Sequence, residues 1–317
     1  MSPDAQAAED PLSADYGDRA PALDVSIILP VYNEAEHLEQ EVTRVRTAMD
    51  ASPYSYEIIV VDDGSTDNSA EVASRIEGIR FLQFLQNRGS GSARKAGTKA
   101  ARGRVTVWTD VDMTYPNDTI PQLVKELEGW DQVVGARTTE EGTVKALRVP
   151  AKWLIRKLAS FLTGTKIPDL NSGFRAFRTD VARQYVNQLP VGFSCVTTIT
   201  MTFLANGYSV KYVPIDYAKR AGESKFHWYK DTRRYATQVV RMILSYNPLR
   251  IFMPVGLLLF AVGFTKLLVD LIGRDFHVAA DTLLILFAAF QVVAIGLLAD
   301  LVGRATRARD EKPPASV

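Results

Sequence analysis

Short apolar runs alternate with stretches of helical periodicity through the first half of the chain. The runs are Val25–Leu29, Glu57–Val61, Ile79–Leu85, Val105–Trp108 and Gln132–Gly135. Each run has the length and apolar content of a buried strand. A stretch rich in small residues, from about Ser90 to Ala101, is expected to form one of the intervening helices. Strands that alternate with helices predict βαβ units, and hence an α/β fold with a mostly parallel sheet and helices on both faces.

Two further features refine this prediction near the first and third strands. Asn33 is expected to cap the first helix, with Glu36 completing a capping box three residues later. The segment Asn87–Gly91, with sequence Asn-Arg-Gly-Ser-Gly, has the composition of a glycine-rich approach to a ligand. It is neither a P-loop nor a Gly-x-Gly-x-x-Gly motif. A simple turn before a helix explains it equally well.

Acidic residues stand where two of the predicted strands end. Asp62 and Asp63 close the second strand, and Asp110 and Asp112 follow the fourth. In parallel sheets ligands bind beyond the carboxyl ends of the strands, so these side chains are expected to converge on one site. Two carboxylates spaced in this way suit Mg²⁺ or Mn²⁺ carrying a diphosphate. An Asp-x-Asp pair alone is weak support, because many loops contain one by chance.

Two long apolar segments lie near the C-terminus. Residues 251–265 carry no charge and the apolar run continues to Val269, whereas residues 282–299 continue to Gly303. About 20 apolar residues span a bilayer as a helix, so both segments are predicted to be transmembrane helices. Lys266 and Asp270 interrupt the first segment, but they stand four residues apart and could pair on one helix face. A buried hairpin in a soluble protein is the alternative.

Basic residues flank both apolar segments and are scarce between them. Arg233, Arg234, Arg241 and Arg250 precede the first segment, and Arg304, Arg307, Arg309 and Lys312 follow the second. The positive-inside rule then places both flanks in the cytoplasm and the hairpin tip outside. We therefore expect an integral protein of the cytoplasmic membrane, with two transmembrane helices and a catalytic domain facing the cytoplasm.

Two basic amphipathic stretches, at about 145–163 and 228–248, have apolar residues on one helical face and Lys and Arg on another. Such helices lie flat on anionic membrane surfaces. Packing against the sheet, with the charged face in solvent, is the alternative. The expected domains are a disordered acidic tail at 1–22, a catalytic domain at 23–227, an interfacial helix at 228–248, the transmembrane hairpin at 249–304 and a cytoplasmic tail at 305–317.

Composition adds few constraints. The chain has 317 residues, of which 47% are hydrophobic, and its formal net charge is +1. This balance favours no class of partner, and we expect no nucleic acid among the partners. Cys195 is the only cysteine, which excludes a disulfide within the chain and a cysteine metal cluster.

Taken together, the motifs resemble the family-2 glycosyltransferases with the GT-A fold. The matching segments, in chain order, are Leu29–Glu34, Val60–Asp67, Asn87-x-Gly89 and Asp110-x-Asp112. Later segments are similar to the polyprenyl-phosphate branch, which includes dolichol-phosphate mannose synthase and bacterial polyprenyl-phosphate glucosyltransferases. These segments are Gly135–Arg137, Asp169-x-Asn171-Ser172-Gly173-Phe174-Arg175 and Arg220-x-Gly222-Glu223-Ser224-Lys225. The resemblance covers roughly Val25 to Arg304.

The resemblance implies a metal-dependent enzyme that moves one sugar, with inversion, from a nucleotide sugar (GDP-mannose or a UDP-hexose) to a polyprenyl (dolichyl or undecaprenyl) phosphate. By this resemblance Pro30, Tyr32, Glu34 and Asp62 hold the nucleotide. Asp110 and Asp112 hold Mg²⁺ or Mn²⁺ and the diphosphate. The residues Arg137, Ser172, Arg220 and Lys225 bind phosphate, and a homo-oligomer can form through the membrane helices.

Simpler roles remain open for several of these residues. Arg137 and Arg175 could form surface ion pairs, and Ser172 could be a turn residue. The acids Glu140, Glu141 and Glu223 could neutralise the cations of the expected phosphate site.

The sequence also departs from its relatives. Many relatives have Gln where this chain has Thr114, and Lys where it has Ser90. The Gln-x-x-Arg-Trp motif of processive relatives is absent, so a single transfer is favoured. The alternatives are a membrane-attached family-2 transferase with another acceptor, an inactive scaffold that binds a sugar nucleotide, and a metal-dependent nucleotidyltransferase.

Overall fold

The computed structural model describes residues 11–12, 23–138, 156–157, 159–161, 163–192, 194–218, 248–273 and 278–310, with side chains up to residue 303. The chain divides into two compact units. The first comprises Met1–Arg156 and Lys166–Phe226, and the second Lys157–Thr165 and His227–Val317. The predicted helix at 145–163 lies largely outside the described residues, and the one at 228–248 lies wholly outside them. The predicted domain boundaries therefore stay predictions.

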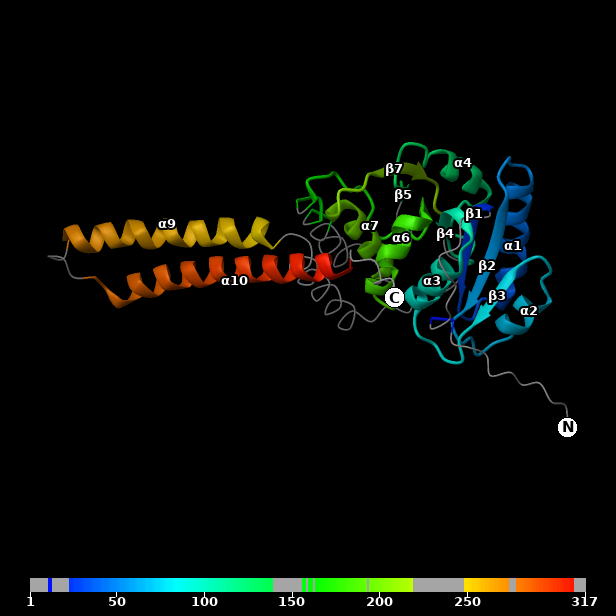
Figure 1. Ribbon diagram of the computed structural model, residues 1–317, viewed down its shortest axis with the longest axis horizontal. Helices are drawn as coiled ribbons and strands as arrows, with labels where there is room; N and C mark the ends of the chain where they lie inside the picture. Colours follow the sequence, from blue (N-terminus) through cyan, green and yellow to red (C-terminus); the bar gives the residue numbers. More distant parts are fainter. Residues whose placement is uncertain are drawn as a thin grey trace, which may run out of the picture. The chain divides into compact units, whose positions relative to one another are not determined.

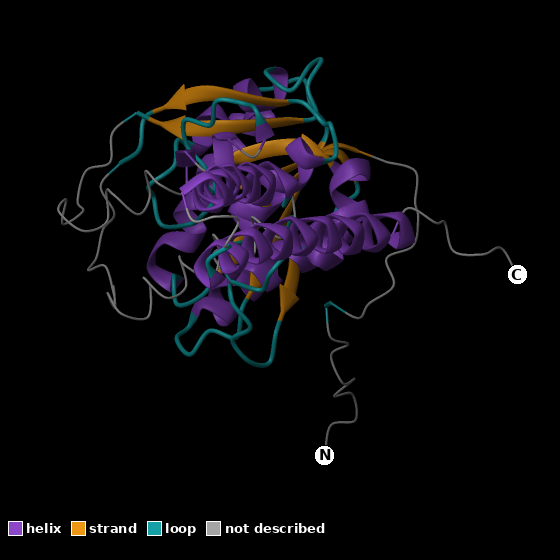
Figure 2. Cartoon of the chain, turned by 90° about the vertical axis from the view of Figure 1, so that its left-hand side faces the viewer, coloured by secondary structure: helices purple, strands orange, loops and turns teal. Residues whose placement is uncertain are grey.

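A seven-stranded sheet forms the centre of the first unit (Figures 1 and 2). Its strands are β1 (Leu23–Val31), β2 (Tyr56–Asp62), β3 (Arg80–Gln83), β4 (Gly103–Trp108), β5 (Gln132–Arg137), β6 (Arg175–Arg178) and β7 (Val210–Ile215). Their order in the sheet is β3-β2-β1-β4-β6-β5-β7. Only β6 runs antiparallel to its neighbours, β4 and β5. The carboxyl ends of β1, β2 and β4 therefore lie at one edge.

Helices cover both faces of the sheet because the strands are apolar on both sides. Ile27 and Leu29 of β1 belong to the core on one face, whereas Ile28 belongs to the core on the other. The first face carries α1 (Ala35–Asp50), α2 (Ser69–Arg75) and α4 (Ile120–Lys125). The second carries α3 (Ser90–Ala100), α6 (Thr179–Tyr185) and α7 (Cys195–Ala205). Two short 3₁₀ helices, η1 (Asn117–Thr119) and η2 (Val186–Gln188), complete the unit.

The predicted α/β class and the five predicted strands are confirmed, but the predicted cap of the first helix is wrong. Helix α1 begins at Ala35, and its N-cap residue, Glu34, makes no side-chain capping bond. Asn33 has a positive φ of 56°, and its side chain accepts a hydrogen bond from the Thr66 amide at 2.8 Å. Ser69, the first residue of α2, supplies a capping oxygen instead, because its Oγ accepts from the Glu34 amide at 2.9 Å.

Two long helices, α9 (Leu249–Gly273) and α10 (Ala280–Asp310), lie side by side in the second unit (Figure 1). Leu249–Gly273 and Ala280–Gly303 are long and apolar enough to cross a membrane. Small residues line their contact, since a Cβ on Gly256 would lie 2.4 Å from Val293 Cγ2 and one on Gly296 would lie 2.6 Å from Phe252 Cβ. Close packing at small residues is typical of transmembrane helix pairs.

Polar residues gather at one end of this hairpin. Lys266 Nζ lies 3.8 Å from Asp270 Oδ2, which confirms the predicted pairing, and it donates to Asp281 Oδ1 at 3.0 Å. Thr282 donates its hydroxyl to Asp270. These contacts join the last part of α9 to the first turn of α10, so the charges that interrupt the apolar segments satisfy one another.

Candidate active site

Asp110 and Asp112 project from the loop that follows β4, as the sequence predicts. Asp110 accepts a hydrogen bond and ion pair from Arg94 Nη2 of helix α3, and its side chain is 33% exposed. Asp112 Oδ1 accepts from the hydroxyl of Thr114 at 2.5 Å and from its amide at 3.3 Å. Thr114, one of the departures from the relatives, thus orients the second carboxylate.

A buried network beneath this loop fixes its backbone. Asn117 Nδ2 donates to the carbonyl of Asp110 at 3.2 Å and to Glu41 Oε2 at 2.6 Å. The hydroxyl of Thr109 donates to Asn117 Oδ1 at 2.5 Å. Burial raises the pKa of Glu41 above its usual value, and the nearby charge of Asp112 acts in the same direction. The backbone at Asp110 is therefore held in place by this network.

The segment before β6 lies next to Asp110. Tyr115 Oη accepts the amide of Gly173 at 2.7 Å, and the Tyr115 ring stacks on Phe174 with ring centres 5.8 Å apart. A Cβ on Gly173 would lie 2.9 Å from Asp110 Oδ2 and 3.3 Å from Arg94 Nη2. Any larger residue here would require the Asp110 carboxylate to shift.

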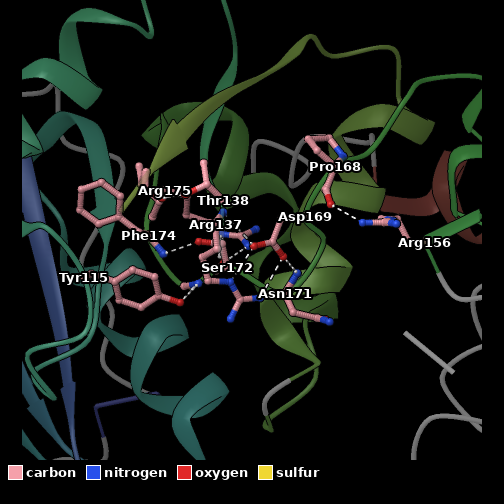
Figure 3. Close-up of polar contacts among 12 residues, drawn as sticks. Tyr115, Arg137, Thr138, Arg156, Pro168, Asp169, Asn171, Ser172, Phe174 and Arg175 are labelled. Carbon is pink, nitrogen blue, oxygen red and sulfur yellow. Dashed lines mark hydrogen bonds and ion pairs between the residues drawn. The ribbon is translucent and has the colours of Figure 1, made fainter. Parts of the chain in front are cut away.

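Arg137, at the end of β5, is held by Asp169 in a two-pronged ion pair (Figure 3). Its Nε donates to Asp169 Oδ2 at 2.7 Å and its Nη2 to Oδ1 at 3.0 Å. Burial alone would raise the pKa of Asp169, but the bonds and charge of Arg137 hold it below its usual value. The guanidinium carbon also lies 5.3 Å from the ring centre of Tyr217, which itself contacts the ring of Tyr115.

Ser172 and Arg175, both drawn in Figure 3, are fully buried. Ser172 is fully buried, its hydroxyl accepts from the Phe174 amide at 3.3 Å, and its carbonyl accepts from Arg175. Arg175 also donates to Thr200 Oγ1 at 2.8 Å. The interpretation of Arg175 as a surface ion pair is wrong, because this side chain is fully buried and, among the described residues, bonds only to carbonyl and hydroxyl oxygens. Burial lowers its pKa to about 10.

The acids that end β2 have separate partners. Asp62 is fully buried and accepts from the amide of Ser65 at 3.2 Å and from its hydroxyl. Asp63 accepts the amides of Arg88 and Gly89 at 2.8 Å each, so it ties the glycine-containing loop to β2. Burial raises the pKa of Asp63 despite these two bonds.

Close backbone packing explains the glycines of the loop Asn87–Gly91. A Cβ on Gly89, where φ is +96°, would lie 2.5 Å from the carbonyl oxygen of Val191. A Cβ on Gly91 would lie 2.4 Å from the carbonyl oxygen of Pro190. Both glycines thus let the start of α3 approach the backbone before α7. The hydroxyl of Ser90 is buried and has no hydrogen-bond partner among the described residues.

The remaining nucleotide-site candidates lie at the end of β1. Pro30 pairs in register with Val61 of β2, and Glu34 is the N-cap residue of helix α1. Tyr32 between them is 44% exposed. Arg220 and Lys225 lie outside the described residues. The roles assigned to all these side chains stay predictions.

Asp110 and Asp112 are the residues that fit a divalent cation. In the part of the chain that the structure describes, no cluster of three or more His, Cys, Asp or Glu side chains could hold a metal ion. The described side chains therefore do not form a metal site in which the protein supplies all the ligands. Two carboxylate side chains suit an ion that takes its other ligands from substrate phosphates and water, as Mg²⁺ does in many phosphate sites.

A cavity of about 1240 Å³ lies elsewhere on the sheet. It is lined by the start of β4 at Gly103 and Arg104, by Trp130 after α4 and by Arg183 of α6. These positions mark the amino ends of the parallel strands, opposite Asp110. None of the predicted site residues lines this cavity, so the cavity does not locate the candidate active site. That site is placed instead by the chemistry of the residues that follow the strand ends.

Comparison with known families agrees with this geometry. Residues 26–186 match the model of glycosyl transferase family 2, and residues 247–305 match that of the GtrB C-terminal hairpin. The second match covers α9 and the apolar part of α10, and together with their length and composition it identifies a membrane protein.

Similar proteins include two undecaprenyl-phosphate 4-deoxy-4-formamido-L-arabinose transferases. Those of Aeromonas hydrophila and Enterobacter sp. are each 32% identical to this chain, over 88% of both chains. A solved structure of glucosyl-3-phosphoglycerate synthase from Mycobacterium tuberculosis, in complex with Mn²⁺, uridine diphosphate and phosphoglyceric acid, shares the fold at a TM-score of 0.56 and 20% identity. That likeness covers 71% of this chain and 78% of that one. The chain is therefore a glycosyltransferase and belongs to glycosyl transferase family 2.

Proposed function

We propose that this glycosyltransferase moves one sugar from GDP-mannose or a UDP-hexose to a polyprenyl phosphate, dolichyl or undecaprenyl, at the cytoplasmic face of the membrane. The observation that carries the proposal is the pair Asp110 and Asp112 beyond β4, in a chain that also has an apolar helical hairpin. The names of the relatives that match 88% of the chain support the choice of acceptor.

The proposed roles are those that the family resemblance implies. Pro30, Tyr32, Glu34 and Asp62 would contact the nucleotide beyond β1 and β2. Asp110 and Asp112 would hold Mg²⁺ or Mn²⁺, which when bound supplies positive charge to the diphosphate leaving group. Arg137, Ser172, Arg220 and Lys225 would contact phosphate. The fixed orientation of Arg137 by Asp169 favours a role in positioning charge, since a preorganised donor needs no rearrangement during the reaction.

The reaction needs little acid–base chemistry. An oxygen of the acceptor phosphate forms a bond to the anomeric carbon while the bond from that carbon to the diphosphate oxygen breaks, which inverts the configuration and releases the nucleoside diphosphate. The acceptor phosphate is already ionised at neutral pH, so no strong general base is required. The main task is to bring two anions together, and Arg137 with the other predicted cations would reduce their repulsion.

A panel assay tests the proposal. The purified full-length protein is incubated in detergent with undecaprenyl phosphate or dolichyl phosphate, with Mg²⁺ or Mn²⁺, and with UDP-hexoses or GDP-mannose in turn. We expect a lipid of increased mass with one class of donor, and none with the corresponding polyprenol that lacks the phosphate. The Asp112→Asn variant is the matched control, because it keeps the shape of the side chain but removes its charge. Transfer to another acceptor only would favour the alternative of a different family-2 transferase.

A further inference from the structure

Arg94 is a buried cation at the candidate site to which sequence reasoning assigned no role. Its side chain is 3% exposed, and its guanidinium carbon lies 5.8 Å from the ring centre of Trp108. Nη2 forms the ion pair with Asp110, whereas Nε is buried and has no hydrogen-bond partner among the described residues. Burying an arginine is costly unless a negative charge compensates it, so Asp110 accounts for the position of this side chain.

The ion pair occupies the same carboxylate that is proposed to bind the metal. Asp110 Oδ1 accepts a hydrogen bond from Arg94. Asp110 Oδ2 lies so close to Gly173 that a Cβ added to this glycine would be only 2.9 Å away. A second buried arginine, Arg175, lies near enough for the charge of Arg94 to affect its pKa. Its partners among the described residues are carbonyl and hydroxyl oxygens. Among the described residues, Asp110 is the carboxylate that pairs with Arg94.

We propose that Arg94 is a positioning residue that acts as the resident counter-ion of Asp110 and competes with the divalent cation for that carboxylate. The inference rests on the metal role of Asp110 in the proposed function. A free divalent cation approaching Asp110 meets the guanidinium charge and binds weakly. A cation that arrives with a nucleoside diphosphate brings negative charge, which the guanidinium attracts. The metal and the nucleoside diphosphate therefore each increase the affinity of the protein for the other, and Arg94 is responsible for part of this increase.

Mn²⁺ binding to the full-length protein in detergent separates this role from a structural one. Free Mn²⁺ is measured by electron paramagnetic resonance, without nucleotide and then with UDP or GDP. We expect Arg94→Met to bind Mn²⁺ alone about tenfold more tightly than the wild type, because a like charge next to the site is gone. The increase in Mn²⁺ affinity that added nucleoside diphosphate causes should fall by a similar factor. Arg94→Lys should restore much of the wild-type behaviour.

The neighbouring residue of the same helix provides a matched control. Lys95→Met removes the same charge, but Lys95 Nζ donates to the carbonyls of Asn187 and Leu189, at 3.3 and 3.0 Å, rather than to Asp110. Its Mn²⁺ affinity should equal that of the wild type. Arg94→Gln, which keeps a hydrogen-bond donor without the charge, should also tighten Mn²⁺ binding and replaces Arg94→Met if that variant does not fold.

Two outcomes would count against the inference in different ways. If Asp110→Asn weakens Mn²⁺ binding but Arg94→Met and Arg94→Gln leave it unchanged, Arg94 is only structural and the metal role of Asp110 stands. If wild type and Asp110→Asn bind Mn²⁺ equally, with nucleotide and without, the metal role of Asp110 in the proposed function is wrong, and the inference about Arg94 is overturned with it.

Discussion

Arg137 and Asp169 form a two-pronged ion pair in which Nε and Nη2 of the arginine donate to both carboxylate oxygens, at 2.7 and 3.0 Å. The side chains are 14% and 9% exposed, and Asp169 also accepts the Asn171 amide at 2.9 Å. The pair thus joins the end of β5 to the segment that leads into β6, and it fixes the guanidinium at the candidate phosphate site.

Breaking this pair should lower both stability and turnover. Asp169→Asn leaves a buried guanidinium without its counter-charge, and breaking a buried pair typically costs about 3–5 kcal/mol. Because Arg137 holds the pKa of Asp169 below its usual value, the stabilisation is present at neutral pH and is lost as the pH falls through that lowered pKa. Thermal unfolding of wild type and Asp169→Asn at successively lower pH measures this, and the difference between the two melting temperatures should shrink as the pH falls below the usual pKa of an Asp carboxyl.

Arg178 offers the control for this prediction. It pairs with Asp131 and Asp180, but its side chain is 49% exposed, and exposed pairs contribute about 0–1 kcal/mol. Arg178→Ala should therefore change the melting temperature and turnover little. Equal losses in the Arg178 and Asp169 variants would show that the Arg137 pair has no special importance.

Gly173→Ala should disable the site with a smaller effect on the fold. The new Cβ would lie 2.9 Å from Asp110 Oδ2 and 3.3 Å from Tyr115 Oη, so the carboxylate must move. A shift of this kind in a catalytic group can reduce the rate about a hundredfold. Steady-state turnover and the melting temperature are measured for each variant. Gly192→Ala, whose Cβ would meet no atom within 4 Å, should behave like wild type. An active Gly173→Ala enzyme would contradict the placement of Asp110 in the site.

Cys195 should be unreactive in the folded protein. It is fully buried at the start of α7, and burial raises the pKa of its thiol to about 11. Only the thiolate reacts with iodoacetamide, so little modification is expected near pH 8 until the protein unfolds. Mass spectrometry of the protein before and after denaturation measures this. Rapid modification of the native protein would show that α7 does not pack as described.

The orientation of the hairpin can be tested in the same chemical way. In a Cys195→Ala background, a cysteine near Asp275 should be labelled from outside intact cells by a membrane-impermeant maleimide, whereas one near Ser65 should not. The flanking arginines are the basis of this expectation, and Arg250, at the start of α9, also donates to the Phe161 carbonyl at 2.6 Å. The reverse labelling pattern would refute the cytoplasmic location of the catalytic domain.

Several parts of the fold follow from local sequence, and others depend on long-range contacts. The strands with continuous apolar runs, such as Val105–Trp108, are predictable because burial on both faces leaves an unmistakable pattern. Strand β6 is not, because Arg175 and Arg178 begin and end its four residues. The antiparallel strand in the middle of the sheet therefore escapes prediction. The Asn33 cap fails for a similar reason, since Ser69 supplies the capping oxygen from the start of α2.

In the candidate site, too, some residues can be identified from local sequence and others only from long-range contacts. Asp110 and Asp112 carry a local signal, two acids after an apolar run. Of their supporting residues, Asp169 stands in a segment that carries the family resemblance, but its contact with Arg137 cannot be read without the fold, and Arg94 and Tyr115 carry no local signal. Arg94, Tyr115 and Asp169 reach the site from α3, from the loop after β4 and from the segment before β6. Arg94 looks like an ordinary helix residue among alanines and glycines, and only its burial against Asp110 shows its importance.

The proposed sugar transfer is tested most directly by the mass of the lipid product that the purified protein forms from undecaprenyl or dolichyl phosphate and a nucleotide sugar. We predict that each lipid gains one sugar, that excess chelator prevents the gain, and that Asp110→Asn and Asp112→Asn lose it while remaining folded. Undiminished transfer in excess chelator would contradict the role given to the two carboxylates. A folded wild-type protein that modifies neither lipid phosphate with any donor in the panel would contradict the proposed reaction itself.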